Sequence, residues 1–325
     1  MQHEITHEIP LLNAQGDLTE PGWARSLLPI YSRKAVKAPK ARIKEWDYYL
    51  VNNGRFALAL TVDDNGYMGL DSISLLDFAE GWEITKSPMT FMPLGSVGMP
   101  ETSRYGDVRH CGRKHSISFE NDGSGQRVLT ARMDDFGPEG ALLASIELFD
   151  EPQDSIVTCT PFTKPGHFYY NQKINCMRAK GSVKYGARLY EFDPSDSFAV
   201  LDWGRGVWTY RNTWYWGSAS YHVGGVPFGW NIGYGFGDTS AASENALFYD
   251  GRAHKLSQVK FNIPGSERDF MSPWTFTSDD GRFEMDFVPV LDRAACTDIK
   301  LIKSDQHQVF GMFTGKAVLD GGTIV

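Results

Sequence analysis

The chain has 325 residues and a formal net charge of −8, with 42% hydrophobic residues and a sequence isoelectric point near 5.5. This length favours two domains over one, and the hydrophobic content is ample for a packed core, which excludes a disordered chain. The acidic balance argues against a nucleic acid partner, because phosphate binding requires a basic surface.

Several features predict a cytoplasmic protein with no membrane span. The N-terminus lacks the basic start and apolar core of a secretory signal. No apolar run approaches the roughly 18 residues needed to cross a bilayer. The cysteines form no CxxC pair, and we interpret them as reduced thiols, mostly buried. They are Cys111, Cys159, Cys176 and Cys296.

An irregular arm is predicted at the N-terminus, followed by β-strands. Prolines interrupt the arm at Pro10, Pro21, Pro29 and Pro39. From Trp46 onward, short β-type runs alternate with Asx-Gly pairs, which favour tight hairpins because both residues tolerate positive φ. These pairs are Asn53-Gly54, Asn65-Gly66, Asp122-Gly123, Asp250-Gly251, Asp280-Gly281 and Asp320-Gly321. Residues 71–80 (DSISLLDFAE) are predicted to form a short helix.

The runs between the turns predict an all-β fold. Segments such as Val128–Met133 and Leu143–Phe149 alternate apolar and polar residues, as a strand with one wet face does. Many antiparallel strands must close their edges, and barrels do so. We therefore expect two tandem antiparallel β-barrels, with the arm and first barrel over residues 1–165 and the second barrel over 166–325.

The candidate site lies in residues 198–254, which hold Trp203, Trp208, Trp214, Trp216 and Trp230 among charged residues. Aromatic walls with a few charged groups are the usual composition of a small-molecule site. On a strand, Trp214 and Trp216 would point to one face. That face is either a barrel interior or an interface between the two halves.

Two carboxylates are the candidate catalytic groups. Asp202 and Arg205 flank Gly204, and the arginine would hold either this aspartate or a substrate carboxylate. A structural salt bridge at a strand bend is the alternative. Glu244, followed by Asn245, precedes an apolar run, and a carboxylic acid in such a dry setting can act as a general acid. A loop glutamate that accepts backbone hydrogen bonds is the alternative.

Further candidates come from residues 169–175 and from histidines. Period-two alternation places Tyr169, Asn171 and Lys173 on one side of a strand, where they would face the same cavity. The run His110-Cys111, with His115, resembles half a metal site, but zinc requires three or four ligands and no second cluster stands nearby. Solvated polar residues explain it as well, so neither metal nor cofactor is expected.

Four blocks carry a family resemblance, and they are Phe168–Met177, Val200–Trp208, Arg211–Ser218 and Glu244–Gly251. In this order they resemble the bacterial family of domain of unknown function 2804, over nearly the whole chain. The layout is more remotely similar to the lipocalin-like group of carotenoid 1,2-hydratase and tocopherol cyclase. That group implies two tandem lipocalin-like barrels and acid-assisted hydration or cyclisation of an apolar alkene.

Two functions fit these observations. The first is an enzyme that hydrates, isomerises or cyclises a double bond of a largely apolar small molecule. In it Asp202 or Glu244 supplies the proton and the aromatic rings stabilise a developing cation. The expected substrate-binding residues are Arg205, Arg211, Trp203, Trp214, Trp216, Trp230, Tyr169, Asn171 and Asn245. The second is a non-catalytic carrier of a hydrophobic or lipid-like ligand, which needs the rings but not the carboxylates. A purely structural interface around the tryptophans is a third reading.

Overall fold

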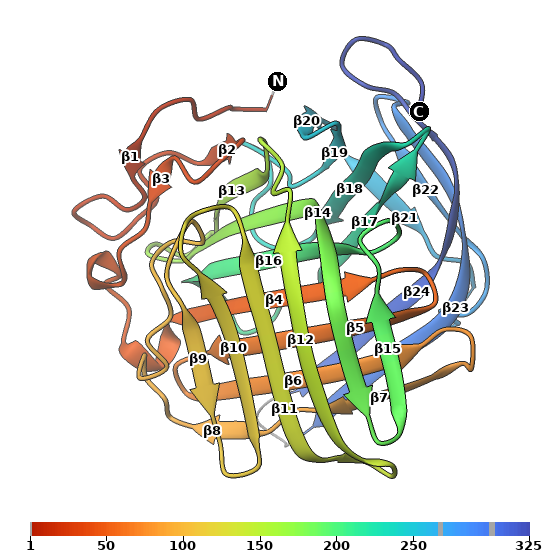
Figure 1. Ribbon diagram of the computed structural model, residues 1–325. Helices are drawn as coiled ribbons and strands as arrows, with labels where there is room; N and C mark the ends of the chain where they lie inside the picture. The colour runs from red at the N-terminus through yellow and green to blue at the C-terminus, as the bar shows by residue number, and fades with distance from the viewer. Residues whose placement is uncertain (1, 266–268, 299–302) are drawn as a thin grey trace.

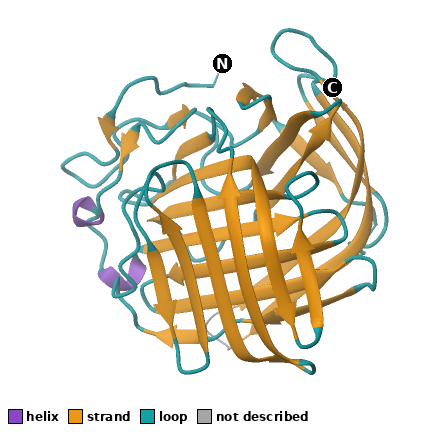
Figure 2. Ribbon diagram, viewed as in Figure 1, coloured by secondary structure: helices purple, strands orange, loops and turns teal. Residues whose placement is uncertain are grey.

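The computed structural model describes residues 2–265, 269–298 and 303–325. The predicted all-β class is confirmed, because these residues form three antiparallel sheets and one short parallel pair of strands, with two short 3-10 helices and no α-helix (Figure 2). Within the same residues, no helix is both long and apolar enough to cross a membrane.

The irregular N-terminal arm lies over the body of the protein (Figure 1). Its elements are β1 (Ile9–Pro10), β2 (Gly22–Ala24), β3 (Pro29–Ile30), η1 (Arg33–Ala35) and η2 (Lys40–Arg42). Backbone hydrogen bonds attach the arm to the body where β2 pairs with β13, whereas β1 and β3 pair with each other within the arm.

A large curled sheet forms the first unit, in the order β7-β6-β5-β4-β16-β14-β12-β11-β10-β9. Strands β8, β13 and β15 attach to β6, β14 and β14, respectively. The bounds are β4 (Lys44–Asn52), β5 (Phe56–Asp64), β6 (Met68–Asp77), β7 (Trp82–Lys86), β8 (Met89–Phe91), β9 (Val108–Cys111), β10 (His115–Asn121), β11 (Arg127–Gly137), β12 (Gly140–Phe149), β13 (Ile156–Pro161), β14 (Phe168–Tyr185), β15 (Arg188–Phe192) and β16 (Phe198–Val207). Figure 1 shows β9 to β12 crossing in front of β4 to β6, so the sheet folds over its own core.

Burial along the strands explains which faces are covered. In β11 and β12, buried and accessible residues alternate, so one face packs on the core and the other meets water. In β5 and β16, nearly every residue is buried. Ala57 and Val200 on these strands belong to a second cluster, on the face away from the main core. That outer face is therefore covered by another part of the chain.

The covering part is a second unit built from two smaller sheets. One sheet has β17 (Tyr215–Val223), β18 (Val226–Tyr234), β19 (Ala246–Tyr249) and β20 (Arg252–Lys255). The other has β21 (Val259–Asn262), β22 (Trp274–Ser278), β23 (Phe283–Asp298) and β24 (Lys303–Ala317). A core of aromatic side chains joins them, including Trp230, Phe276 and Phe283.

The change from the first unit to the second falls between β16 and β17. Strands β14 and β16, which lie after residue 165, hydrogen-bond with β12 and β4 of the large sheet. The connection 208–214 then leads to β17. The stretch from 198 onward therefore spans both units rather than one barrel.

A bulge in β14 connects the two units. Its register with β16 shifts between Ile174 and Met177, and Cys176 has a φ of 64°. The backbone N–H of Cys176 donates to Ser220 Oγ on β17 at 3.0 Å, and Asn175 Nδ2 donates to the Trp230 carbonyl on β18 at 3.0 Å. The bulge thus fixes the position of β17 and β18 beside β14.

Most of the predicted turns join consecutive strands. Asn53-Gly54, Asn65-Gly66, Asp122-Gly123, Asp250-Gly251 and Asp280-Gly281 lie between neighbouring strands, and each glycine has positive φ. The helix predicted over residues 71–80 is wrong, because most of this segment belongs to β6. Pairing with β5 and β7 on either side overrides its local helical preference.

Candidate functional site

Three polar side chains stand in a row across the outer face of the large sheet. Asp202 on β16 is the direct partner of Tyr48 on β4 and of Lys173 on β14. Because cross-strand partners point to the same face, the three side chains are neighbours. The Lys173 ammonium lies 2.6 Å from Asp202 Oδ1.

The second unit adds a second carboxylate to this row. Glu244 Oε2 lies 3.7 Å from the Lys173 ammonium. Asn231 on β18 holds this carboxylate, since its Nδ2 donates to Glu244 Oε2 at 3.0 Å. Trp216 Nε1 on β17 donates in turn to Asn231 Oδ1 at 2.7 Å, and the Trp216 ring lies 5.0 Å from the ammonium. Asp202 and Glu244 therefore converge on one lysine from different units.

Two glycines leave room for these side chains. A Cβ atom on Gly233 would lie 2.4 Å from Glu244 Oε1, and one on Gly204 would lie 2.1 Å from the Trp46 ring. Such distances are far below van der Waals contact, so a side chain at either position would displace its neighbour. At Gly204 the indole of Trp46 packs directly against the backbone.

Aromatic rings surround one side of the charged row. Tyr169 stacks on Trp46 with ring centroids 5.7 Å apart, and Phe236 meets Tyr169 edge-on at 4.8 Å. Trp208 packs edge-on against Trp46 at 5.4 Å. Trp46, Trp208 and Phe236 are all partly accessible to solvent. The wall comes from the first unit and from the connections on either side of β17–β18.

Burial is uneven within the cluster. The Lys173 side chain is 2% exposed, whereas Asp202 and Glu244 are 16% and 17% exposed. Both carboxylates are therefore partly accessible to solvent, while the ammonium is buried behind them. Burial raises the pKa of Tyr169 well above its usual value, and the negative charges of Asp202 and Glu244 raise it further. Tyr169 consequently keeps its proton.

Asn171 supports Tyr169 on the same face of β14. Its Nδ2 donates to the Tyr169 hydroxyl at 2.8 Å, and its Oδ1 accepts from Thr158 Oγ1 at 2.5 Å. The alternation predicted for Tyr169, Asn171 and Lys173 is therefore present in the structure. Among the expected site residues, Asp202, Glu244, Trp216, Tyr169 and Asn171 come together here.

Arg205 and Trp203 lie on the opposite face of β16, in the first unit. Both are fully buried, and the Arg205 guanidinium lies 4.1 Å from the Trp203 ring. Arg205 pairs with Asp47 at 3.0 Å and donates to backbone carbonyls, including that of Pro100. A spacing of three residues on a strand places Asp202 and Arg205 on opposite faces, so the expected pair between them does not form.

Three other expected residues are placed away from the charged row. Arg211 is exposed in the connection between β16 and β17. Trp214 is 47% exposed and touches only the rim of the aromatic wall, through Phe236 at 5.9 Å. Trp230 points into the core of the second unit, where it meets Phe313 at 5.0 Å. Trp214 and Trp216 therefore do not form a single wall, because β17 begins only at Tyr215.

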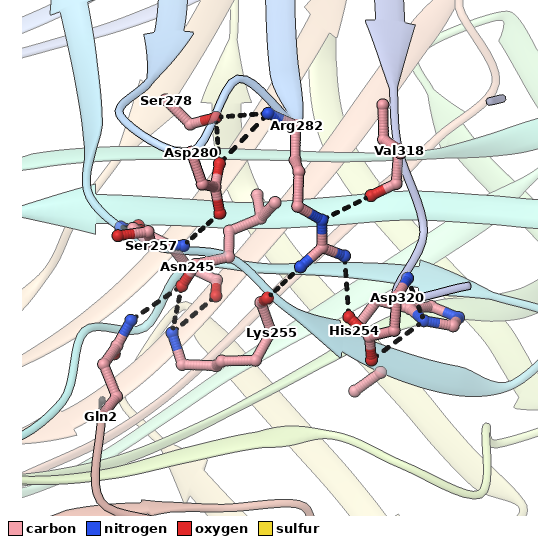
Figure 3. A network of polar contacts seen from close by, with 12 residues as sticks. Gln2, Asn245, His254, Lys255, Ser257, Ser278, Asp280, Arg282, Val318 and Asp320 are labelled. Atoms are coloured by element: carbon pink, nitrogen blue, oxygen red, sulfur yellow. Dashed lines mark hydrogen bonds and ion pairs between the residues drawn. The ribbon is translucent and has the colours of Figure 1, made fainter. Parts of the chain in front are cut away.

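The side chain of Asn245, next to Glu244, forms hydrogen bonds with the backbone. Its Oδ1 accepts from the Gly233 backbone N–H at 2.7 Å, and its Nδ2 donates to the Ser257 carbonyl at 2.9 Å. Lys255 donates to the Asn245 carbonyl at 2.7 Å, within the polar network of Figure 3. Arg282 continues this network by donating to the Lys255 carbonyl at 2.8 Å.

The sequence did not single out Trp46, Tyr48 or Asn231 as site residues. Trp46 and Tyr48 begin the first long strand, about 150 residues before Asp202 in the chain, and only the β4–β16 pairing brings them together. The spacing of two residues between Trp46 and Tyr48, which places both on one face of a strand, was the signal that the sequence offered. Lys173 is placed on the predicted strand face but is not among the expected substrate-binding residues, although both carboxylates converge on it.

These features define the class of the protein as all-β, with a lipocalin-like arrangement of antiparallel strands in two units and a carboxylate–lysine cluster between them. Solved structures share the fold. CghA with Sch210972 is 13% identical with a TM-score of 0.56, over 94% of this chain and 92% of that chain. Kievitone hydratase from Nectria haematococca is 11% identical with a TM-score of 0.54, over 94% of this chain and 97% of that chain.

The chain belongs to the family described as domain of unknown function DUF2804, whose model matches residues 2–325. The predicted family is therefore confirmed. No curated protein sequence matches the chain.

Proposed function

We propose that the protein is an enzyme that transfers a proton to a double bond of a largely apolar small molecule, in hydration, isomerisation or cyclisation. The observation that supports this most is the convergence of Asp202 and Glu244 on Lys173, beside partly accessible aromatic rings. A carrier of an apolar ligand has no need for two carboxylates around a buried ammonium, which are costly to desolvate. Kievitone hydratase, which has a similar fold, is a hydratase by name, and this supports the proposed class of chemistry.

The two carboxylates have different roles in this proposal. Asp202 is closer to the ammonium, at 2.6 Å, so it is the better candidate for the base. Glu244 lies farther, at 3.7 Å, and accepts a hydrogen bond from a neutral amide, so it is the better candidate for the proton donor. Lys173 is a positioning residue that balances the charge.

A hydration would proceed with atoms and charge balanced. The Glu244 carboxyl delivers its proton to one alkene carbon, and water adds to the neighbouring carbon while Asp202 takes a proton from that water. The proton then returns from Asp202 to Glu244 across the Lys173 ammonium. In an isomerisation, Asp202 would instead remove a proton from carbon.

The aromatic rings support the same step. Positive charge that develops on carbon is stabilised by the faces of nearby aromatic rings. Trp216 already lies 5.0 Å from the Lys173 ammonium. Tyr169 keeps its proton, chiefly because of burial, so its hydroxyl can orient a substrate oxygen.

Native mass spectrometry of the wild type and of Glu244→Gln tests the proposal. Both proteins are purified in parallel, and any bound molecule is identified by mass and by chromatography after release. An inactive enzyme retains substrate, so the variant should hold a precursor of what the wild type holds. For a hydration the two molecules differ by the mass of one water.

Identical ligands in both proteins would contradict the enzyme and favour the carrier. Asn212→Asp, in the connection before β17, is a control that changes one amide to a carboxylate outside the cluster. It should retain the same molecule as the wild type.

A further inference from the structure

A second cluster of chemically reactive side chains lies in the first unit, away from the proposed catalytic site. Asp71 is on β6, His110 on β9 and His115 on β10, so they come from strands near opposite ends of the large sheet. One ligand atom from each residue lies within 4.8 Å of the others. The sheet curls far enough to bring its two ends together at this point.

All three side chains point to the core side of the sheet. On β6, Asp71 is spaced by two residues from Ile73 and by four from Leu75, so it shares their core-facing side, and on β10 His115 shares that side with Ile117. Cys111 follows His110 directly on β9, so it points to the other face and is exposed. The proposed catalytic row, by contrast, lies on the outer face of β4, β16 and β14.

Both imidazoles contact the same oxygen of the Asp71 carboxylate. Asp71 Oδ2 lies 2.6 Å from His110 Nδ1 and 2.7 Å from His115 Nε2. The Asp71 side chain is 4% exposed, and the imidazoles of His115 and His110 are 11% and 25% exposed. These histidines are therefore not the solvated polar residues that the sequence allowed.

The hairpin between β9 and β10 is built to hold His115 in place. A Cβ atom on Gly112 would lie 2.2 Å from the His115 ring, so only glycine leaves space for the imidazole to fold back. The Gly112 backbone N–H donates to the His115 carbonyl at 3.0 Å, which closes the turn. The third ligand that the sequence lacked, Asp71, is supplied by a strand some forty residues earlier.

We propose that Asp71, His110 and His115 bind a divalent transition-metal ion of the zinc type. Two imidazole nitrogens and one carboxylate oxygen form a donor set that such ions prefer. Tetrahedral bonds of about 2.0–2.1 Å place ligand atoms roughly 3.3 Å apart. The two histidine nitrogens, which lie 2.6 and 2.7 Å from Asp71 Oδ2, would therefore each move away from this oxygen by about 0.6–0.7 Å. The ion would link β6 to the β9–β10 hairpin.

A depression of about 320 Å³ lies beside His115. His115 lines it together with Ser87, Lys114 and Asp135, whereas Asp71 and His110 are not part of its lining. Three protein ligands with an open position toward solvent are typical of a metal ion that also binds water. A fourth ligand of the proposed ion would therefore be water.

Zinc titration of the metal-free protein by isothermal calorimetry tests the site directly. The full chain is first dialysed against a chelator, and cobalt absorption spectra give an independent signature of a nitrogen and oxygen environment. We expect one Zn²⁺ to bind per chain, and Asp71→Asn to weaken its affinity by about tenfold or more. The side-chain oxygen of the introduced asparagine can still accept hydrogen bonds from both histidines. If the three residues only formed hydrogen bonds with one another, Asp71→Asn would therefore leave them in place.

Two further variants keep the test decisive. His110→Gln removes the most accessible ligand and should weaken Zn²⁺ binding similarly, even if Asp71→Asn does not fold. His167→Gln alters a histidine in the loop before β14, where the ring contacts the Pro165 carbonyl, and should leave the affinity unchanged. Absence of Zn²⁺ binding to the wild type, or equal affinity in the wild type and His110→Gln, would overturn the proposal.

Discussion

Replacement of Lys173 by methionine removes the positive charge between two carboxylates and keeps most of the apolar side chain. Asp202 and Glu244 would then face each other across the unit boundary without the ammonium that lies 2.6 Å and 3.7 Å from them. Loss of one partner of a buried ion pair costs about 3–5 kcal/mol. Because the carboxylates are 16% and 17% exposed, water offsets part of this, and we expect a loss of about 2–3 kcal/mol.

A double-mutant cycle with Asp202→Asn isolates the interaction. Neutralising the closer carboxylate removes most of the repulsion, so the double variant should be more stable than the sum of the single changes by about 1 kcal/mol or more. Urea denaturation at neutral pH gives the free energy of unfolding for all four proteins. Additivity within about 0.5 kcal/mol would refute the assigned ion pair.

Three further changes test other parts of the structure. Gly233→Ala should displace the Glu244 carboxylate and change the retained ligand. Gly217→Ala is the control, because its Cβ would meet only side chains, at 3.1 Å or more, and it should retain the same ligand as the wild type. Native mass spectrometry compares the ligands of the two variants. Arg205→Met should destabilise the protein by about 3–5 kcal/mol in urea, because its buried acceptors lose their donor, without changing which ligand is retained. Burial lowers the pKa of Lys255 from 10.5 to about 7, so between these pH values the unfolded chain binds more protons than the folded chain. The free energy of unfolding of the wild type, relative to that of Lys255→Met, should therefore rise from about pH 7 to about pH 10. A difference between the two proteins that does not change with pH would contradict this.

The sequence was sufficient for the fold class because its signals are local. In the five Asx-Gly turns that join consecutive strands, the glycine has positive φ. Both residues of the pair have positive φ at Asp250-Gly251, at 48° and 74°, whereas in the other four turns only the glycine does. Alternation in β11 and β12 likewise reflects one wet and one dry face. Residues 71–80 were misassigned because their strand state depends on pairing with distant segments.

The site was predictable only where one strand carries it. The alternation of Tyr169, Asn171 and Lys173 places all three on one face, and the structure keeps them there. By contrast, the density of tryptophan in 198–254 does not separate Trp216, at the ammonium, from Trp230, in the core of the second unit. Their faces depend on how two units pack, and this information is not local in the sequence.

The incorporation of deuterium tests the central claim of proton transfer most directly. The molecule released from the wild type is returned to fresh protein in deuterated water and then analysed by mass spectrometry. Wild type should introduce deuterium on carbon, and Glu244→Gln should do so at least about tenfold more slowly, as expected for loss of a general acid. A ligand that gains no carbon-bound deuterium with the wild type would contradict the proposed enzyme.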